Sequence, residues 1–211
     1  RRVSGSFDRE GFKDDHTSYS NGQALLRTAK VDGARQMWLS ASLNILRQDP
    51  ASPHPRDGAS LSAAVPTEAN HNPAGAFMNE NRVAISGGWQ RPVLRNATWG
   101  ATASYTFSGQ SMFRGFLVDL SNTQNNAAGF KENIDINDLY ADTYVMWPEK
   151  AHIRFMTGAD LLFAAGEAKG ATFTYTVPLN GATQTAVAEP STLNADAEDE
   201  RRFLGAYTSA Q

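Results

Sequence analysis

Apolar and polar residues alternate along five segments of the chain, at 35–47, 82–91, 97–108, 138–147 and 152–164. In the first of these segments Met37, Leu39 and Ala41 are each separated by one polar or aromatic residue. A period of two places alternate side chains on opposite faces of an extended chain, as in a β-strand with one apolar and one polar face. Weaker alternation at 23–31 and 201–211 adds two candidate strands. Because helical periodicity is almost absent, the sequence predicts an all-β fold of about seven to eight strands.

The connections between these segments alternate in length. Short turns are expected at 32–34, 92–96 and 148–151, whereas long polar segments are expected at 48–81, 109–137 and 165–199. Structureless loops longer than about 15 residues are uncommon in compact domains. In an antiparallel meander every second connection lies on the same rim, so all the long loops emerge on one side. Short turns on one rim and long loops on the other predict an up-and-down meander that forms part of a transmembrane β-barrel.

The alternating positions assigned to the apolar faces of the five clear strands, such as Met37–Ile45 and Val83–Trp89, contain no charged residue, although charged residues make up 19% of the chain. Contact with lipid imposes this exclusion, whereas contact with water does not. We expect the opposite, polar faces to line the barrel interior, where arginines can pair with carboxylates on neighbouring strands. The residues predicted to face this lumen are Arg82, Tyr140, Asp142, Tyr144, Arg154 and Asp160.

Aromatic residues fall at both ends of the apolar faces. Three tryptophans lie within a few residues of the short turns, and three other aromatic residues lie at the opposite strand ends. Aromatic belts of this kind mark the two interfaces of a membrane. The predicted girdle consists of Trp89, Trp99 and Trp147 at one interface and of Tyr105, Phe107 and Phe163 at the other.

Composition narrows the classes of function. The net charge of −3 and the absence of a Lys/Arg run longer than two predict no nucleic-acid partner. The chain has no cysteine, and His54 and His71 share a long segment with carboxylates but lack metal-ligand spacing. No Ser/His/Asp arrangement, phosphate loop or paired carboxylates indicate catalysis. We therefore expect a protein that is not an enzyme, with no catalytic residue, bound metal or cofactor.

Several phrases of the sequence resemble the barrel of a TonB-dependent outer-membrane receptor. They are Arg82–Trp89, the strand 97–107, Met112–Phe116 and Gly129–Asp142, together with the strand-end phrases Phe7–Phe12 and Phe203–Tyr207. Receptors of this family are barrels of about 22 strands, plugged by an N-terminal domain. They import scarce solutes such as iron–siderophore complexes, cobalamin or glycans with energy passed on by TonB. The resemblance assigns no functional residue, because the best characterised ones of the family lie outside the matching part.

The resemblance implies a location in the outer membrane of a Gram-negative cell. The expected partners are outer-membrane lipid, an imported small solute, and TonB through an N-terminal part that precedes this segment. We expect residues 1–211 to be one partial barrel domain, because the chain begins with Arg1 and shows neither a signal peptide nor a plug. Two alternatives stay open: a small complete outer-membrane barrel that serves as an anchor or adhesin, and a soluble β-sandwich that binds at a cell surface.

Overall fold

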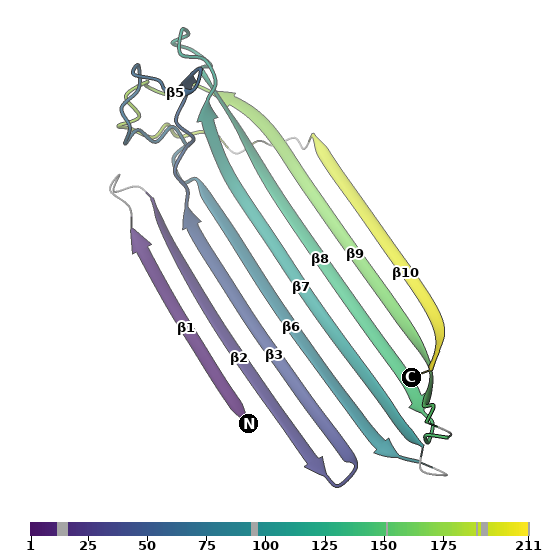
Figure 1. The fold of residues 1–211 in the computed structure, drawn as a ribbon. Coiled ribbons are helices and arrows are strands. Elements are labelled where there is room, and N and C mark those ends of the chain that lie inside the picture. The colour runs from purple at the N-terminus through teal and green to yellow at the C-terminus, as the bar shows by residue number, and fades with distance from the viewer. Residues whose placement is uncertain (12–16, 94–96, 151, 189, 191–193, 211) are drawn as a thin grey trace.

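The computed structural model describes residues 1–11, 17–93, 97–150, 152–188, 190 and 194–210. Eight long strands form one sheet, and two short strands form a separate hairpin in the connection between β3 and β6 (Figure 1). The long strands are β1 (Arg2–Gly11), β2 (Ser18–Asp32), β3 (Arg35–Asp49), β6 (Phe77–Pro92), β7 (Thr98–Leu117), β8 (Ala127–Met146), β9 (Phe155–Tyr175) and β10 (Ala195–Ala210). The short strands are β4 (Arg56–Asp57) and β5 (Ser60–Leu61).

The large sheet is an antiparallel meander in which each long strand pairs with the next one along the chain. Its order is β1-β2-β3-β6-β7-β8-β9-β10, and within the described residues β1 and β10 form its two edges. The predicted all-β meander is therefore confirmed. The described residues do not form the two packed sheets that a β-sandwich requires.

The register of the sheet brings the predicted apolar faces together. Met37 lies opposite Trp89, and Trp89 lies opposite Ala101, so their side chains share one face. The same face continues across β8 and β9, where Ala101 pairs with Thr143 and Thr143 pairs with Ala159. We call this side the apolar face and the opposite side the polar face.

Strands β7, β8 and β9 are longer than the alternation indicated. The expected loop 109–137 is wrong, because β7 runs to Leu117 and β8 begins at Ala127. The expected loop 165–199 is also shorter, since β9 continues to Tyr175 and β10 begins at Ala195. In these outer parts polar residues occupy both faces, so the apolar–polar alternation is lost. The strands nevertheless continue to pair.

The short turns and the longer connections lie at opposite ends of the sheet (Figure 1). Gly33 makes the tight turn between β2 and β3 with a φ of 56°, a conformation that glycine adopts without steric cost. At the other end, the β3–β6 and β9–β10 connections pack on the ends of β7–β9. The buried hydrophobic residues of this loop cluster are Val65, Leu117, Ala127, Tyr175 and Val177.

Within the described residues, no helix is long and apolar enough to cross a membrane.

Candidate functional site

The polar face of β8–β10 carries a connected group of acidic and phenolic side chains. Asp142 on β8 lies directly opposite Asp160 on β9, and two like charges in this position repel each other. The hydroxyl of Tyr207 on β10 donates a hydrogen bond of 2.7 Å to Oδ2 of Asp142. This bond crosses β9 at Gly158, which pairs with Tyr207 on one side and Tyr144 on the other.

Of the six residues predicted to face a lumen, five lie in strands on the polar face. Tyr140, Asp142 and Tyr144 alternate along β8, and Asp160 on β9 lies opposite Asp142. The hydroxyl of Tyr144 reaches Oε1 of Gln90 at 3.4 Å, a long hydrogen bond. These residues therefore share one face, which is the arrangement that a barrel interior needs.

Arg154 differs from its predicted place. Strand β9 begins at Phe155, so Arg154 belongs to the β8–β9 turn, where its guanidinium lies 3.5 Å from the Glu149 carboxylate. The expected pairing of Asp142 or Asp160 with an arginine is wrong in the described residues, because Asp142 accepts its hydrogen bond from Tyr207 instead. The turn places Arg154 next to Glu149. Arg154 therefore pairs with this nearby carboxylate and not with Asp142 or Asp160.

Arg82 lies apart from the acidic group, in a second region of the polar face. It borders a depression of about 610 Å³ over β1, β2, β3 and β6. The polar side chains around it are Ser4, Ser6, Gln23, Ser42 and Asn44. The lining of this depression is thus neutral and basic, whereas the group around Asp142 and Asp160 is acidic.

The three tryptophans lie on the apolar face near the short turns. The rings of Trp89 and Trp99 pack edge to face with centroids 4.6 Å apart, and Arg91 lies over both rings. Trp99 Nε1 donates a hydrogen bond of 2.8 Å to the Thr143 hydroxyl. Indole rings that bury their apolar surface and satisfy their N–H are characteristic of an interfacial belt.

The same arrangement recurs on neighbouring strands. Trp147 Nε1 donates to the Thr157 hydroxyl at 3.1 Å, which repeats the Trp99–Thr143 contact one strand further on. At the opposite ends, the hydroxyl of Tyr105 donates to Oδ1 of Asn137 at 2.7 Å. Polar partners on this face therefore lie near the aromatic residues at its two ends.

Phe107 and Phe163 lie in the second aromatic region of the apolar face. Phe107 pairs with Asn137, and Phe163 pairs with Leu139 on β8 and with Arg202 on β10. The Arg202 guanidinium lies 5.7 Å from the centroid of the Phe163 ring. The structure thus places the six predicted girdle residues in two groups on one face.

His71 is buried in the loop cluster at the longer-loop end. Its Nε2 lies 3.1 Å from the carbonyl oxygen of Leu179, while the hydroxyl of Tyr175 donates a hydrogen bond to the His71 carbonyl oxygen. The other ring nitrogen, Nδ1, is buried and has no hydrogen-bond partner among the residues that the structure describes. Burial lowers the pKa of His71, the Leu179 carbonyl raises it to a smaller extent, and nearby His54 lowers it further.

Asparagines make most of the polar contacts inside the loop cluster. Asn72 Nδ2 donates a hydrogen bond of 2.7 Å to the Pro50 carbonyl, and Asn72 Oδ1 accepts a hydrogen bond of 2.9 Å from the Gly115 amide. Asn126 donates to and accepts from the backbone of Val177. These buried amides fix the connections against the strand ends, since each substitutes for a missing strand partner.

Sequence reasoning did not single out the Tyr207 hydroxyl, Arg91 or Asn72. Tyr207 lies in a segment of weak alternation, and its partner Asp142 is 65 positions away in the sequence. Arg91 comes two positions after Trp89, at the end of a clear alternation. The period of two therefore could have predicted that Arg91 lies on the apolar face. Nothing in the local pattern indicates that Asn72 and Asn126 are buried.

Comparison with solved structures places the chain within a known architecture. It is similar to the structure of the FpvAI–pyocin S2 complex, with a TM-score of 0.67 and 12% identity over 99% of this chain. It is also similar to Pseudomonas aeruginosa FpvA bound to a heterologous pyoverdine, with a TM-score of 0.68 and 11% identity over 99% of this chain. A third match, the ferripyoverdine receptor of the outer membrane of Pseudomonas aeruginosa bound to ferripyoverdine, has a TM-score of 0.56 and 10% identity.

The chain spans 30–34% of the length of these receptor structures. No protein-family profile matches it, and no curated protein matches it in sequence. At 10–12% identity the likeness concerns the fold. The resemblance to a TonB-dependent receptor barrel that the sequence indicated is therefore confirmed at the level of architecture.

Proposed function

We propose that residues 1–211 are part of the barrel of a TonB-dependent outer-membrane receptor that imports a scarce solute. The observation that carries this proposal is the match of 99% of the chain to outer-membrane receptor structures. The continuous apolar face supports it, because a receptor barrel exposes such a face to lipid and encloses a polar interior. On this proposal Arg82, Tyr140, Asp142, Tyr144 and Asp160 face the interior.

The apolar face has dimensions suited to a membrane. Strands β6–β9 contain 16–21 residues. At about 3.3 Å per residue and a tilt of about 45°, they reach roughly 37–49 Å, more than the apolar band of about 25 Å. The extra strand length lies at the longer-loop end. There the row of Gly109, Asp135 and Glu167 follows the aromatic group on the same face. Those strand ends then project from the membrane.

The proposed solute is a ferric siderophore, with cobalamin and glycans as the other solutes of the family. The structural neighbours support this choice, because two of them hold a pyoverdine or ferripyoverdine and another holds pyocin S2. Transport in this proposal depends on TonB, which contacts a part of the receptor outside these residues. Within these residues the contribution is the barrel wall, its polar interior and its outer connections.

The orientation of the two faces is tested by single cysteines, which are introduced into residues 1–211 without competition from a native cysteine of this segment. In the full-length natural protein, Ala103→Cys lies on the apolar face and Ser104→Cys on the polar face of β7. A water-soluble maleimide is expected to label Ser104→Cys, and a lipid-soluble maleimide is expected to label Ala103→Cys, in isolated outer membranes. Equal labelling of both by the water-soluble reagent contradicts the placement in lipid.

Transport is tested by deleting the gene and supplying one solute class at a time under limitation. Loss of growth on one ferric siderophore, restored by the gene only in a strain with TonB, supports the proposal. The same deletion is expected to leave passive uptake of small sugars unchanged, which serves as the control. Unchanged growth on siderophores, cobalamin and glycans contradicts an import function.

A further inference from the structure

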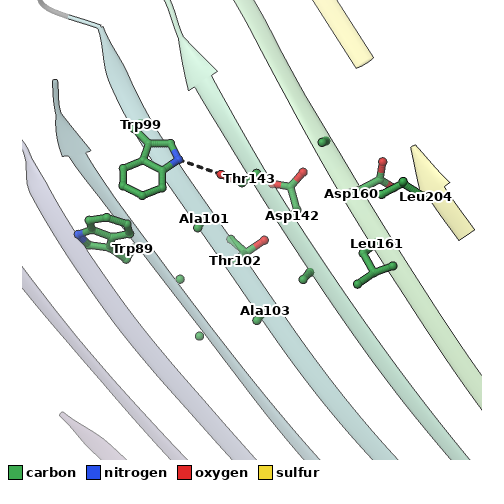
Figure 2. Close-up of a pocket in the computed structure, with 14 residues that line it drawn as sticks. Trp89, Trp99, Ala101, Thr102, Ala103, Asp142, Thr143, Asp160, Leu161 and Leu204 are labelled. Atoms are coloured by element: carbon green, nitrogen blue, oxygen red, sulfur yellow. Dashed lines mark hydrogen bonds between the residues drawn. The ribbon is translucent and has the colours of Figure 1, made fainter. Parts of the chain in front are cut away.

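A hollow lies in the apolar face across β6–β9, next to the two packed tryptophans (Figure 2). Its volume of about 660 Å³ falls within the range of roughly 300–1,000 Å³ that is usual for small-molecule sites. The floor of the hollow consists of small residues, because Gly87, Ala103 and Ala141 form one registered row and Ala101 and Ala159 belong to the next.

Large side chains close the two ends of the hollow. Trp89 and Trp99 stand at the end over β6 and β7, and Leu161 and Leu204 stand at the end over β9 and β10 (Figure 2). The Trp99–Thr143 hydrogen bond of 2.8 Å holds the indole ring at the border of the hollow. The hollow is therefore elongated across the strands. In strands tilted by about 45°, this direction also lies about 45° from the membrane normal.

One cation stands at the tryptophan end. The Arg91 guanidinium carbon lies 5.2 Å from the Trp89 ring centroid and 5.4 Å from the Trp99 ring centroid. Within the described residues, no carboxylate lies within ion-pair distance of Arg91. The two rings restrict the position of the guanidinium and leave its N–H groups free for an anion.

We propose that this part of the apolar face binds an anionic glycerophospholipid. The phosphate contacts Arg91 at the tryptophan end, and an acyl chain lies in the hollow over the small residues. The inference rests on the proposed function, because the apolar face meets lipid only in a membrane. Asp142 and Asp160 border the hollow, but their carboxylates belong to the polar face, where Asp142 accepts a hydrogen bond from Tyr207. The charge pattern therefore selects the occupant: a cation at the end of a hollow whose apolar-face side chains are uncharged complements a molecule with one anionic head and an apolar tail.

The test uses the full-length natural protein, purified in dodecyl maltoside and titrated with dioleoyl-phosphatidylglycerol, with bound lipid counted by native mass spectrometry. We expect one saturable phosphatidylglycerol per chain from this site. Arg91→Gln is expected to weaken that binding about fivefold, the contribution of one basic side chain near an anionic lipid. Ala103→Leu fills the hollow and is expected to weaken phosphatidylglycerol binding about tenfold. This is the effect expected if about two methylene groups of the acyl chain lose their contact with the hollow.

Two matched variants serve as controls. Arg154→Gln removes a cation of the same rim that pairs with Glu149 and lies outside the hollow, and Ala41→Leu enlarges a residue of the apolar face outside the hollow. Both are expected to bind phosphatidylglycerol like the unchanged protein. Equal binding by all four variants, or non-saturable binding, overturns the lipid site.

Three further outcomes bear on both the inference and the proposed function. A dimer that Arg91→Gln dissociates assigns the hollow to a second copy of the chain and overturns the lipid site while the receptor proposal stands. A protein that is absent from the membrane fraction overturns both. Binding of phosphatidylglycerol without any solute import supports the lipid site and contradicts the transport proposal alone.

Discussion

Tyr207 joins two strands that do not pair with each other. Its hydroxyl donates a hydrogen bond of 2.7 Å to Asp142 across β9. This bond stabilises the negative charge of one of the two facing carboxylates. Without this donor, Asp142 and Asp160 keep their mutual repulsion and lose a charge-assisted hydrogen bond. The bond therefore stabilises the C-terminal part of the sheet more than a hydrogen bond between two neutral groups would.

Tyr207→Phe removes only this hydroxyl. We expect it to lower the free energy of unfolding of the full-length protein by about 1.5–3 kcal/mol, the usual net value of a hydrogen bond to a charged group. Urea unfolding in detergent measures the change. Tyr144→Phe is the control, because its hydroxyl reaches Gln90 at the longer distance of 3.4 Å. A larger loss for Tyr144→Phe than for Tyr207→Phe contradicts the role assigned to Tyr207.

His71 makes the loop cluster sensitive to acid. Burial lowers its pKa from the ordinary value of 6.5, so the folded cluster favours the neutral ring. The sign follows from linkage: above pH 6.5 this stabilisation is present, and it is lost as the pH falls from there towards the lowered pKa.

Amide hydrogen exchange of residues 62–76, corrected for the intrinsic pH dependence of exchange, measures this effect. Between pH 7.5 and 5 we expect protection to fall by up to about tenfold per pH unit below 6.5. His71→Gln keeps a side-chain donor near Leu179 but does not titrate, so its protection is expected to stay constant. A fall of the same size in His71→Gln would falsify the assignment to His71.

The strands depend on glycines where large polar-face side chains cross them. A Cβ at Gly158 would lie 2.4 Å from Cζ of Tyr207 and 2.7 Å from the backbone oxygen of Thr143. At Gly166, on the same strand and face, the nearest atoms would lie at 3.8 and 3.9 Å, which is ordinary contact. The two positions thus differ in what covers them rather than in backbone conformation.

Gly158→Ala is therefore expected to destabilise the protein by about 1–3 kcal/mol, because either the tyrosine or the β8 backbone must shift. Gly166→Ala is expected to be neutral or to stabilise by up to about 1 kcal/mol through a less flexible unfolded chain. Parallel urea unfolding curves of the two variants give the comparison. Equal destabilisation would show that loss of glycine itself, rather than the Tyr207 contact, matters in β9.

At the level of elements, alternation predicted strands well where one face is apolar. The segment 82–91 lies within β6, with Val83, Ile85 and Trp89 on one face as expected. It predicted strand ends poorly where both faces are polar, as at Gln110 and Ser111 in β7. There the backbone hydrogen bonds of neighbouring strands extend the sheet, and side-chain patterning carries no signal.

At the level of the whole molecule, the sequence predicted the meander and its two faces but not the contacts between distant segments. His71 and Leu179 meet in the loop cluster although they are 108 positions apart. Such contacts depend on which strand ends lie side by side, and period-two alternation does not contain that information. The polar-face contact of Tyr207 with Asp142 escaped prediction for the same reason.

The open sheet leaves apolar surface and two unpaired edges exposed. Val3 and Phe7 on β1 are 78% and 70% exposed, and Leu204 on β10 is 79% exposed. Unpaired edges add strands from other chains, and large apolar patches associate in water. We expect residues 1–211, prepared alone, to aggregate in aqueous buffer and to become dispersed in detergent, as measured by light scattering.

Substitutions at the β1 edge separate the two causes of this aggregation. Phe7→Lys places a charge on the edge strand and is expected to slow aggregation. Leu139→Lys places the same charge on the apolar face of β8, between Tyr105 and Phe163, and tests the contribution of that surface. If neither substitution changes the scattering, and the segment stays monomeric in buffer without detergent, then its apolar face is not a lipid-facing surface and the receptor-barrel proposal fails.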